Sequence, residues 1–162
     1  MSKLGARLRR IVGIPETHTE FAQILRYREG GYYRRHHDQW SLHWTPQGVR
    51  LFTLFVYLST TGDGLEGGGT AFHNLSVTVE PKLGRGLLWP NYADDGWRVE
   101  RETFHEALPV VGGTKFAFNL WFYQHDLQTN RGKCAYAPRA NVQGAEWAPP
   151  RKARQSGEGG DA

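Results

Sequence analysis

The residues best suited to chemistry in this 162-residue sequence are His36 and Asp38, in the triplet His36-His37-Asp38. Side chains alternate between the two faces of an extended strand, so an imidazole and a carboxylate two residues apart share a face. Two such ligands can hold one metal ion, and a third from a distant strand would leave other positions open. Two histidines and one carboxylate with open positions are typical of non-haem Fe(II) oxygenases. The triplet alone is weak, because the chain has seven histidines from which a third ligand could be chosen.

The sequence around this triplet resembles the prolyl 4-hydroxylase family of Fe(II)- and 2-oxoglutarate-dependent dioxygenases. Five segments match motifs of that family in the family's order: Ile24 to Asp38, the first metal motif; Arg50 to Ser59, the next core strand; Glu66 to Phe72, the glycine-rich G-G-E-T-x-F segment; Val79 to Leu88, the P-x-x-G-x-x-L-x-F stretch; and His105 to Lys115, the H-x-x-x-P-V-x-x-G-x-K motif. Together they cover about Leu25 to Tyr123, so the sequence is identified as a member of this family.

The resemblance implies roles for the matched residues at the metal and co-substrate. His36, Asp38 and His105 would ligate Fe(II). Lys115, ten residues after His105, would pair with the distal carboxylate of 2-oxoglutarate. A buried carboxylate needs such a compensating cation. Tyr27 would hydrogen-bond the same carboxylate, its alternative being an ordinary core aromatic.

Three further residues match positions that line the substrate groove of peptidyl-proline hydroxylases: Tyr33, Arg50 and Trp121. The alternatives are a surface arginine at a strand start for Arg50 and core packing for Trp121. Thr53 and Thr70 are candidates for an additional hydroxyl in the site. By contrast, we do not expect His37 to be a ligand, because it faces away from its neighbours in the triplet. Nor do we expect ligands in His43, His73 and His125.

The resemblance also implies the reaction. Fe(II), 2-oxoglutarate and O2 would be used to hydroxylate a C–H bond, with peptidyl proline as the expected substrate, with release of succinate and CO2, and with ascorbate as an accessory reductant. The partner would be a proline-containing peptide or protein, while free amino acids and other peptidyl residues stay open. Two alternatives are a catalytically silent jelly-roll binding module and a cupin-like metal protein that uses no keto acid. The intact set His36, Asp38, His105 and Lys115 argues against the silent module, because a silent relative usually loses at least one of them. Lys115 argues against the cupin-like protein, which needs no buried cation at that position.

The chain departs from the family pattern at two positions. Gly69 stands where the family usually has Glu, and Tyr123 where it often has a second His. We expect both positions to lie nearer to the substrate than to the metal, which leaves the substrate more open than the chemistry. Relatives also commonly carry several dozen residues before the equivalent of Ile11, and that segment supports their sheet.

Strands must position these residues. Leu51–Leu58 is rich in aromatic and β-branched residues and predicts a buried strand. His105–Val111 and Lys115–Tyr123 predict a hairpin around Gly112-Gly113, which would place Lys115 beside His105. Shorter strands are expected at Phe21–Tyr27, Ser76–Val79 and Gly86–Trp89. Short strands at about 8–12-residue spacing indicate an all-β sandwich or barrel. Our preferred fold is a jelly roll, or double-stranded β-helix, with few flanking helices.

The chain has the length of one domain. We expect a basic N-terminal segment at 1–20, the dioxygenase domain at 21–126, and a C-terminal extension at 127–162 that ends in disorder. The net charge of +4 is concentrated in basic runs, but no nucleic-acid-binding module accompanies them. Without an apolar run of about 20 residues or a signal peptide, the chain is expected to be soluble. Its single cysteine, Cys134, excludes an internal disulfide and weakly favours the cytoplasm.

Overall fold

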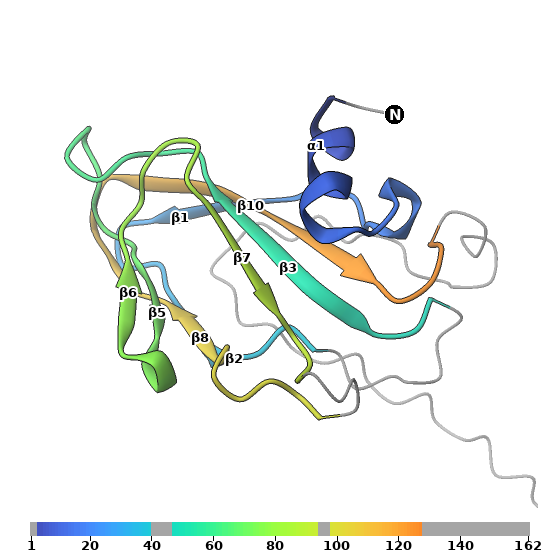
Figure 1. Ribbon diagram of the computed structural model, residues 1–162. Coiled ribbons are helices and arrows are strands. Elements are labelled where there is room, and N and C mark those ends of the chain that lie inside the picture. The colour runs from blue at the N-terminus through green and yellow to red at the C-terminus, as the bar shows by residue number, and fades with distance from the viewer. Residues whose placement is uncertain (1–2, 40–46, 94–97, 128–162) are drawn as a thin grey trace, which may run out of the picture.

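Two four-stranded antiparallel sheets face each other in the computed structural model, which describes residues 3–39, 47–93 and 98–127 (Figure 1). The first sheet has the order β1 (Gln23–Arg28), β10 (Thr114–Tyr123), β3 (Arg50–Tyr57) and β7 (Gly86–Pro90). The second has the order β2 (Tyr33–His36), β8 (His105–Ala107), β5 (Thr70–Phe72) and β6 (Val77–Val79). A small third sheet pairs β4 (Glu66–Gly67) with β9 (Val110–Gly112). This arrangement confirms the jelly-roll prediction.

Helical structure is sparse within the described ranges. It consists of α1 (Lys3–Val12) and two single 3-10 turns, η1 (Glu16–His18) and η2 (His73–Leu75). None of these is long and apolar enough to span a membrane. Three parts of the sequence analysis lie outside the described residues: His43, Cys134 and the C-terminal extension beyond residue 127.

Both faces of the first sheet are covered, which explains the nearly continuous apolar run of β3. On the inner face, Phe55 and Tyr57 pack with Phe72 of the second sheet. The outer face is covered by α1 (Figure 1), where Leu54 packs with Leu8. Burying each such side chain is worth about 1.5–3 kcal/mol relative to exposure. Alternate side chains of β3 therefore pack against the second sheet on one face and against α1 on the other.

Helix α1 covers part of the outer face with one stripe of its surface. Leu8 is buried and Val12, four residues later, packs against the same cluster, as expected for positions that lie one above the other on a helix. The helix ends at Gly13, whose φ of 72° suits a left-handed C-terminal cap, and the Gly13 N–H donates to the carbonyl of Arg9. The basic segment near the N-terminus is thus a helix packed on the sheet.

The predicted hairpin between the His105 and Lys115 strands is wrong. β8 pairs with β2 and β5, whereas β10 pairs with β1 and β3, so His105 and Lys115 belong to different sheets. The Gly112-Gly113 segment instead leads from β9 into β10, and Gly113 has a φ of 80°. The two residues approach each other across the space between the sheets rather than along one of them.

Candidate functional site

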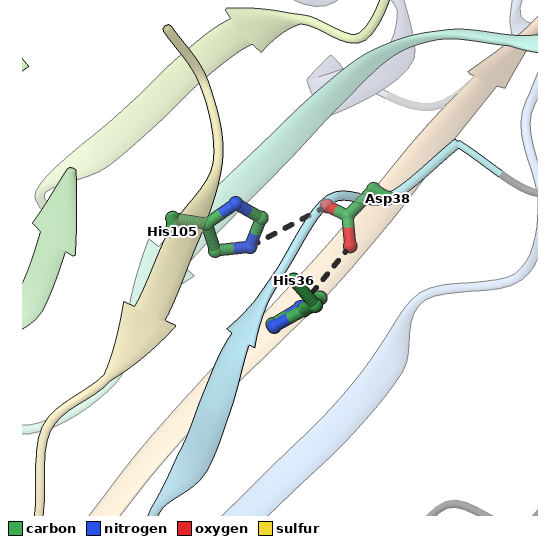
Figure 2. A group of neighbouring side chains, drawn as sticks. All are labelled: His36, Asp38 and His105. Carbon is green, nitrogen blue, oxygen red and sulfur yellow. Dashed lines mark ion pairs between the residues drawn. The ribbon is translucent and has the colours of Figure 1, made fainter. Parts of the chain in front are cut away.

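His36, Asp38 and His105 lie together at one end of the space between the sheets (Figure 2). One candidate ligand atom from each residue lies within 4.8 Å of the other two. The His36 Nε2 is 3.5 Å from Asp38 Oδ1, and the His105 Nε2 is 3.8 Å from Asp38 Oδ2. Both imidazole Nε2 atoms therefore face the same carboxylate.

The backbone brings the three side chains together in two steps. His36, the last residue of β2, is the register partner of His105 on β8, so the two imidazoles are neighbours. Their ring centroids are 4.3 Å apart. Asp38 was expected to share an extended strand with His36, but β2 ends at His36 and Asp38 lies in a bend beyond it. The bend turns the carboxylate toward the first sheet.

Each histidine is fixed from its far side by a backbone carbonyl. The His36 Nδ1 donates to the carbonyl of Arg34 at 2.7 Å, and the His105 Nδ1 donates to the carbonyl of Thr103 at 2.9 Å. Because a carbonyl can only accept, Nδ1 holds a ring proton, and in the neutral imidazole the free lone pair is then on Nε2. This second hydrogen bond is the usual way that metal-ligating histidines are oriented.

Burial and neighbouring charges set the protonation of the cluster. Burial opposes ionisation of Asp38, but its interactions with His36 and His105 and the hydrogen bond from Thr53 hold the pKa of the carboxyl well below its usual range. Burial lowers the pKa of His105, against the opposing effect of Asp38. A carboxylate beside a neutral imidazole is the state that binds a metal cation. One carboxylate and two imidazoles on one side of a point fit a ferrous ion with open positions.

Lys115 is a buried cation with no visible counterpart. Its side chain is 1% exposed, and the ammonium has no hydrogen-bond partner among the described residues. The nitrogen lies 5.3–5.4 Å from the ring centroids of Tyr27, Phe55 and Tyr57. Burial lowers its pKa from 10.5 to about 8, with partial compensation from the negative charge of Glu80. An ammonium in this state fits the carboxylate of a ligand.

Tyr27 is the register partner of Lys115 on the adjacent strand β1, so the two predicted co-substrate residues are neighbours. Burial raises the pKa of Tyr27 to about 12, which keeps its hydroxyl protonated and able to donate. Gly68 passes close to the lysine stem with a φ of +74°, and an added Cβ would lie 3.1 Å from Lys115 Cδ. Glycine therefore lets the loop pass over Lys115 without strain or collision.

The lysine and the metal cluster border the same inter-sheet core. The ring of His105 contacts Phe72 and Trp89, with centroids 5.6 Å and 4.7 Å away. Those two residues belong to the same buried cluster as the Phe55 and Tyr57 that surround Lys115. His105 and Lys115 are therefore connected through one set of packed aromatic side chains between the sheets.

The two predicted hydroxyls have separate roles. Thr53 Oγ1 donates to Asp38 Oδ2 at 2.8 Å, so this hydroxyl lies at the metal cluster. Thr70 Oγ1 is 2.6 Å from the Tyr57 hydroxyl, which also bonds the carbonyl of Val79 at 2.8 Å. Thr70 is thus next to the aromatic residues that surround the lysine.

Two of the predicted substrate residues, Arg50 and Trp121, form a second cluster on the inner face of the first sheet. The Arg50 guanidinium lies 3.9 Å from the Trp121 ring centroid and donates two hydrogen bonds to Glu20 Oε1, at 2.7 and 3.0 Å. It also donates to the Tyr123 hydroxyl at 3.1 Å, and that hydroxyl is hydrogen-bonded to Glu20. Arg50 is therefore not the solvated arginine of the alternative interpretation, since only 11% of its side chain is exposed.

Tyr33 and Trp121 both lie beside the candidate metal residues. The Tyr33 ring lies 3.9 Å from the ring of His36, centroid to centroid. Trp121 is the register partner of Thr53, whose hydroxyl bonds Asp38. The indole Nε1 of Trp121 is buried with no hydrogen-bond partner in the part of the chain that is described, so it is a donor available to a ligand.

The departures from the family pattern have different surroundings. Tyr123 is in the Arg50 cluster, beside the predicted substrate residues. The space beside Gly69 is bordered instead by Glu80, Thr78 and Val79. The glycine at position 69 thus adjoins the end of β6, and its nearest neighbours include none of the predicted metal or substrate residues.

The chain matches the family model described as "2OG-Fe(II) oxygenase superfamily" over residues 22–123. It belongs to this family. The matched residues include the candidate metal residues, Lys115 and the Arg50 cluster except Glu20. The family implies Fe(II), 2-oxoglutarate and O2.

Individual relatives of this oxygenase are prolyl hydroxylases by name. It is 30% identical over 76% of its length to "Prolyl 4-hydroxylase subunit alpha-2" of Gallus gallus and 31% identical over 67% to a "Putative prolyl 4-hydroxylase" of Acanthamoeba polyphaga mimivirus. The matches cover 23% and 47% of those proteins, so the chain spans less than half the length of these relatives.

A solved structure gives the same comparison in three dimensions. The oxygenase resembles the viral collagen prolyl hydroxylase vCPH from Paramecium Bursaria Chlorella virus-1, described in its 2OG complex, with a TM-score of 0.64 and 30% identity. The similarity covers 75% of this chain and 70% of that one. The family and the fold predicted from the motifs are both confirmed.

The oxygenase also has residues at the site that sequence reasoning missed. Glu20 neutralises Arg50, the Thr103 carbonyl orients His105, and Asn91 donates to Thr53. Of the histidines set aside, His37 packs on Phe104, outside the cluster. His73 forms an exposed ion pair with Glu106. Glu20 and Asn91 belong to no motif quoted for the family, so only the fold shows their position.

Proposed function

We propose that this chain is an Fe(II)- and 2-oxoglutarate-dependent dioxygenase that hydroxylates a C–H bond of a prolyl residue in a peptide. The observation that supports it best is the combination of a two-histidine, one-carboxylate cluster with a buried, unpartnered Lys115 across the same core. The relatives' names and the vCPH structure, all prolyl hydroxylases, supply the substrate class.

His36, Asp38 and His105 hold the iron from one side. Bound iron supplies the activation of O2, coupled to the conversion of 2-oxoglutarate to succinate and CO2. The protein's part is to point two Nε2 atoms and one carboxylate at the same position before the metal arrives, because the hydrogen bond from Nδ1 of each histidine to a carbonyl already orients its ring.

Lys115 and Tyr27 hold the distal carboxylate of 2-oxoglutarate. The ammonium is compensated when the co-substrate enters, and the tyrosine hydroxyl on the neighbouring strand donates to the same group. Since the interior around Lys115 is aromatic and closed to water, the charge pair is stronger there than at a surface. The pairing also orients the other end of the co-substrate toward His105.

Tyr33, Arg50 and Trp121 bind the peptide. Arg50 stays charged but is balanced by Glu20, so its cluster does not need an acidic side chain in the substrate. The unpartnered Trp121 Nε1 and the guanidinium are donors for backbone carbonyls. An extended polyproline-type peptide has free carbonyls and little conformational entropy to lose, and aromatic surfaces suit it. Ascorbate would restore enzyme that has turned over without a substrate.

The experiment is mass spectrometry on a mixed peptide library incubated with the purified chain, Fe(II), 2-oxoglutarate and ascorbate under 18O2. The expected product is a proline-containing peptide that gains one 18O atom, with one succinate formed per hydroxylation. Arg50→Ala should raise the KM for the peptide. The slow, peptide-independent consumption of 2-oxoglutarate should stay nearly unchanged.

Two results would contradict parts of the proposal separately. Oxygen found only on residues other than proline would remove the prolyl assignment and leave the dioxygenase assignment intact. Peptide hydroxylation at the same rate without added 2-oxoglutarate would remove the co-substrate, and with it the role of Lys115.

A further inference from the structure

We propose that Thr53 and Asn91 form a positioning relay that engages one oxygen of Asp38 and leaves the other for the metal. The inference rests on the proposed function, because it concerns the same metal cluster. Thr53 is fully buried and Asn91 is 1% exposed, so neither is held by solvent. Both are the kind of buried polar residue that requires a hydrogen-bonding partner.

The hydrogen bonds of the relay can run in only one direction. An ionised carboxylate accepts but cannot donate, so the Thr53 hydroxyl must donate its single proton to Asp38 Oδ2, 2.8 Å away. The Thr53 oxygen can then only accept from Asn91, and Asn91 Nδ2 lies 3.0 Å from it. The other contact, Asn91 Oδ1 to Thr53 Oγ1, is longer at 3.4 Å. Asn91 therefore donates to Thr53, and Thr53 donates to Asp38.

The fold holds this relay rigidly. Thr53 sits in the middle of the first sheet, between register partners Trp121 on β10 and Trp89 on β7. Asn91 follows β7 directly, its N–H donates to the Leu51 carbonyl, and its own carbonyl accepts from Glu100. Little conformational entropy remains to be lost when the relay orients Asp38, which itself lies in a bend without strand pairing.

Engaging Oδ2 has a consequence for coordination number. With the two histidines, a carboxylate that offers one oxygen to iron would supply a third ligand atom, and one that offers both oxygens would supply a third and a fourth. Fewer protein ligand atoms would leave more room at the metal for a keto acid and O2. The Thr53 hydrogen bond draws Oδ2 toward the first sheet and so favours single-oxygen binding by Asp38.

The test uses metal binding alone, with Thr53→Val as the variant that keeps the shape and removes the hydroxyl. Mn(II) affinity is measured from the EPR signal of the unbound ion, and the coordination of Co(II) from its visible absorption spectrum. We expect Thr53→Val to bind Mn(II) about 10-fold more weakly or worse and to change the Co(II) bands. Thr53→Ser, which restores the hydroxyl, should return both readouts to near wild type.

Asn91→Leu isolates the first step of the relay. The Thr53 hydroxyl is then free to rotate, and we expect a loss of Mn(II) affinity smaller than that of Thr53→Val. The melting temperature of each metal-free variant serves as the control for a purely structural role. Lower melting temperatures with unaltered Mn(II) affinity and Co(II) spectra would overturn the positioning role.

The same experiment separates the two proposals. If wild type binds Mn(II) and Co(II) and Thr53→Val binds them equally well with the same spectrum, the relay is wrong and the proposed function stands. If wild type binds neither ion, or if His105→Ala binds both like wild type, the metal centre itself is wrong and the relay fails with it.

Discussion

The two ends of the site, the candidate metal residues and Lys115, differ in whether their polar groups already have hydrogen-bond partners within the protein. At the metal end, the far side of each side chain is already hydrogen-bonded: His36 and His105 to backbone carbonyls, and Asp38 to Thr53. At the other end, the Lys115 ammonium is buried among aromatic rings, and none of the described residues hydrogen-bonds it. One end is organised in advance, and the other is completed only by an anion.

This difference separates stability from function. Hydrogen bonds at the metal end stabilise the fold and orient the ligands at once. The buried charge of Lys115 opposes folding, because an ionised group removed from water without a partner costs several kcal/mol. A residue that destabilises the empty protein is retained most simply because its partner arrives with the ligand.

Breaking the organised end should have the largest effect. His105→Ala and Asp38→Ala should each lower 2-oxoglutarate turnover by roughly 1,000-fold or more, since the several kcal/mol that a metal ion provides are lost. Succinate formation and iron content by atomic absorption are the measurements. His73→Ala, a histidine of the exposed ion pair with Glu106, is the matched control and should keep both. Full iron occupancy in His105→Ala would exclude that residue as a ligand.

Removing the charge at the other end should make the empty protein more stable. A pKa lowered from 10.5 to about 8 in the folded protein corresponds to about 3 kcal/mol of unfavourable free energy at pH 7. Between those two values the unfolded chain binds the extra proton, so stability rises with pH there and is level below about 8. The free energy of unfolding of Lys115→Met should be higher than that of wild type by up to about 3 kcal/mol at pH 7. It should also no longer increase with pH above about 8.

Urea unfolding of the ligand-free protein at pH 7 and at pH 10 measures this effect. Lys82→Met is the matched control, because Lys82 is exposed and its removal should change stability little. A Lys115→Met variant less stable than wild type at pH 7 would mean that the ammonium has a partner within the protein, and the contrast between the two ends would disappear.

The smallest effect is expected at the Arg50 cluster. Glu20→Gln keeps the shape and hydrogen bonds in part but removes the charge that balances Arg50. Because the pair is only partly buried, we expect a change of about 1 kcal/mol, or roughly 5-fold, in the peptide KM. The affinity for 2-oxoglutarate should not change. Steady-state kinetics with proline peptides that carry or lack an acidic neighbour should show tighter binding of the acidic peptide by Glu20→Gln.

Some of this site could be predicted because polar residues interrupt apolar strands. Thr53 stands alone in the run Leu51–Leu58, and Lys115 precedes an equally apolar run; both are buried in the structure. The metal residues followed from spacing and family motifs. All of these patterns are local in the sequence, so the residues they indicate do not depend on which strands pair.

Pairing itself could not be read from the sequence. The Gly112-Gly113 turn between two alternating runs is an ordinary hairpin signal, yet β8 pairs with β2 and β5 in one sheet and β10 pairs with β1 and β3 in the other. Glu20 and Asn91 were missed for the same reason. Their partners, Arg50 and Thr53, are 30 and 38 residues away in the chain, and only the fold brings them into contact.

The most direct test of the account compares two keto acids on two proteins. Binding of 2-oxoglutarate and of 2-oxopentanoate, which lacks the distal carboxylate, is measured by calorimetry on Mn(II)-loaded wild type and Lys115→Met without O2. Wild type should prefer 2-oxoglutarate by about 30-fold or more, the worth of a closed-site charge pair, and Lys115→Met should lose nearly all of that preference. An equal preference in both proteins would contradict the pairing of Lys115 with the co-substrate.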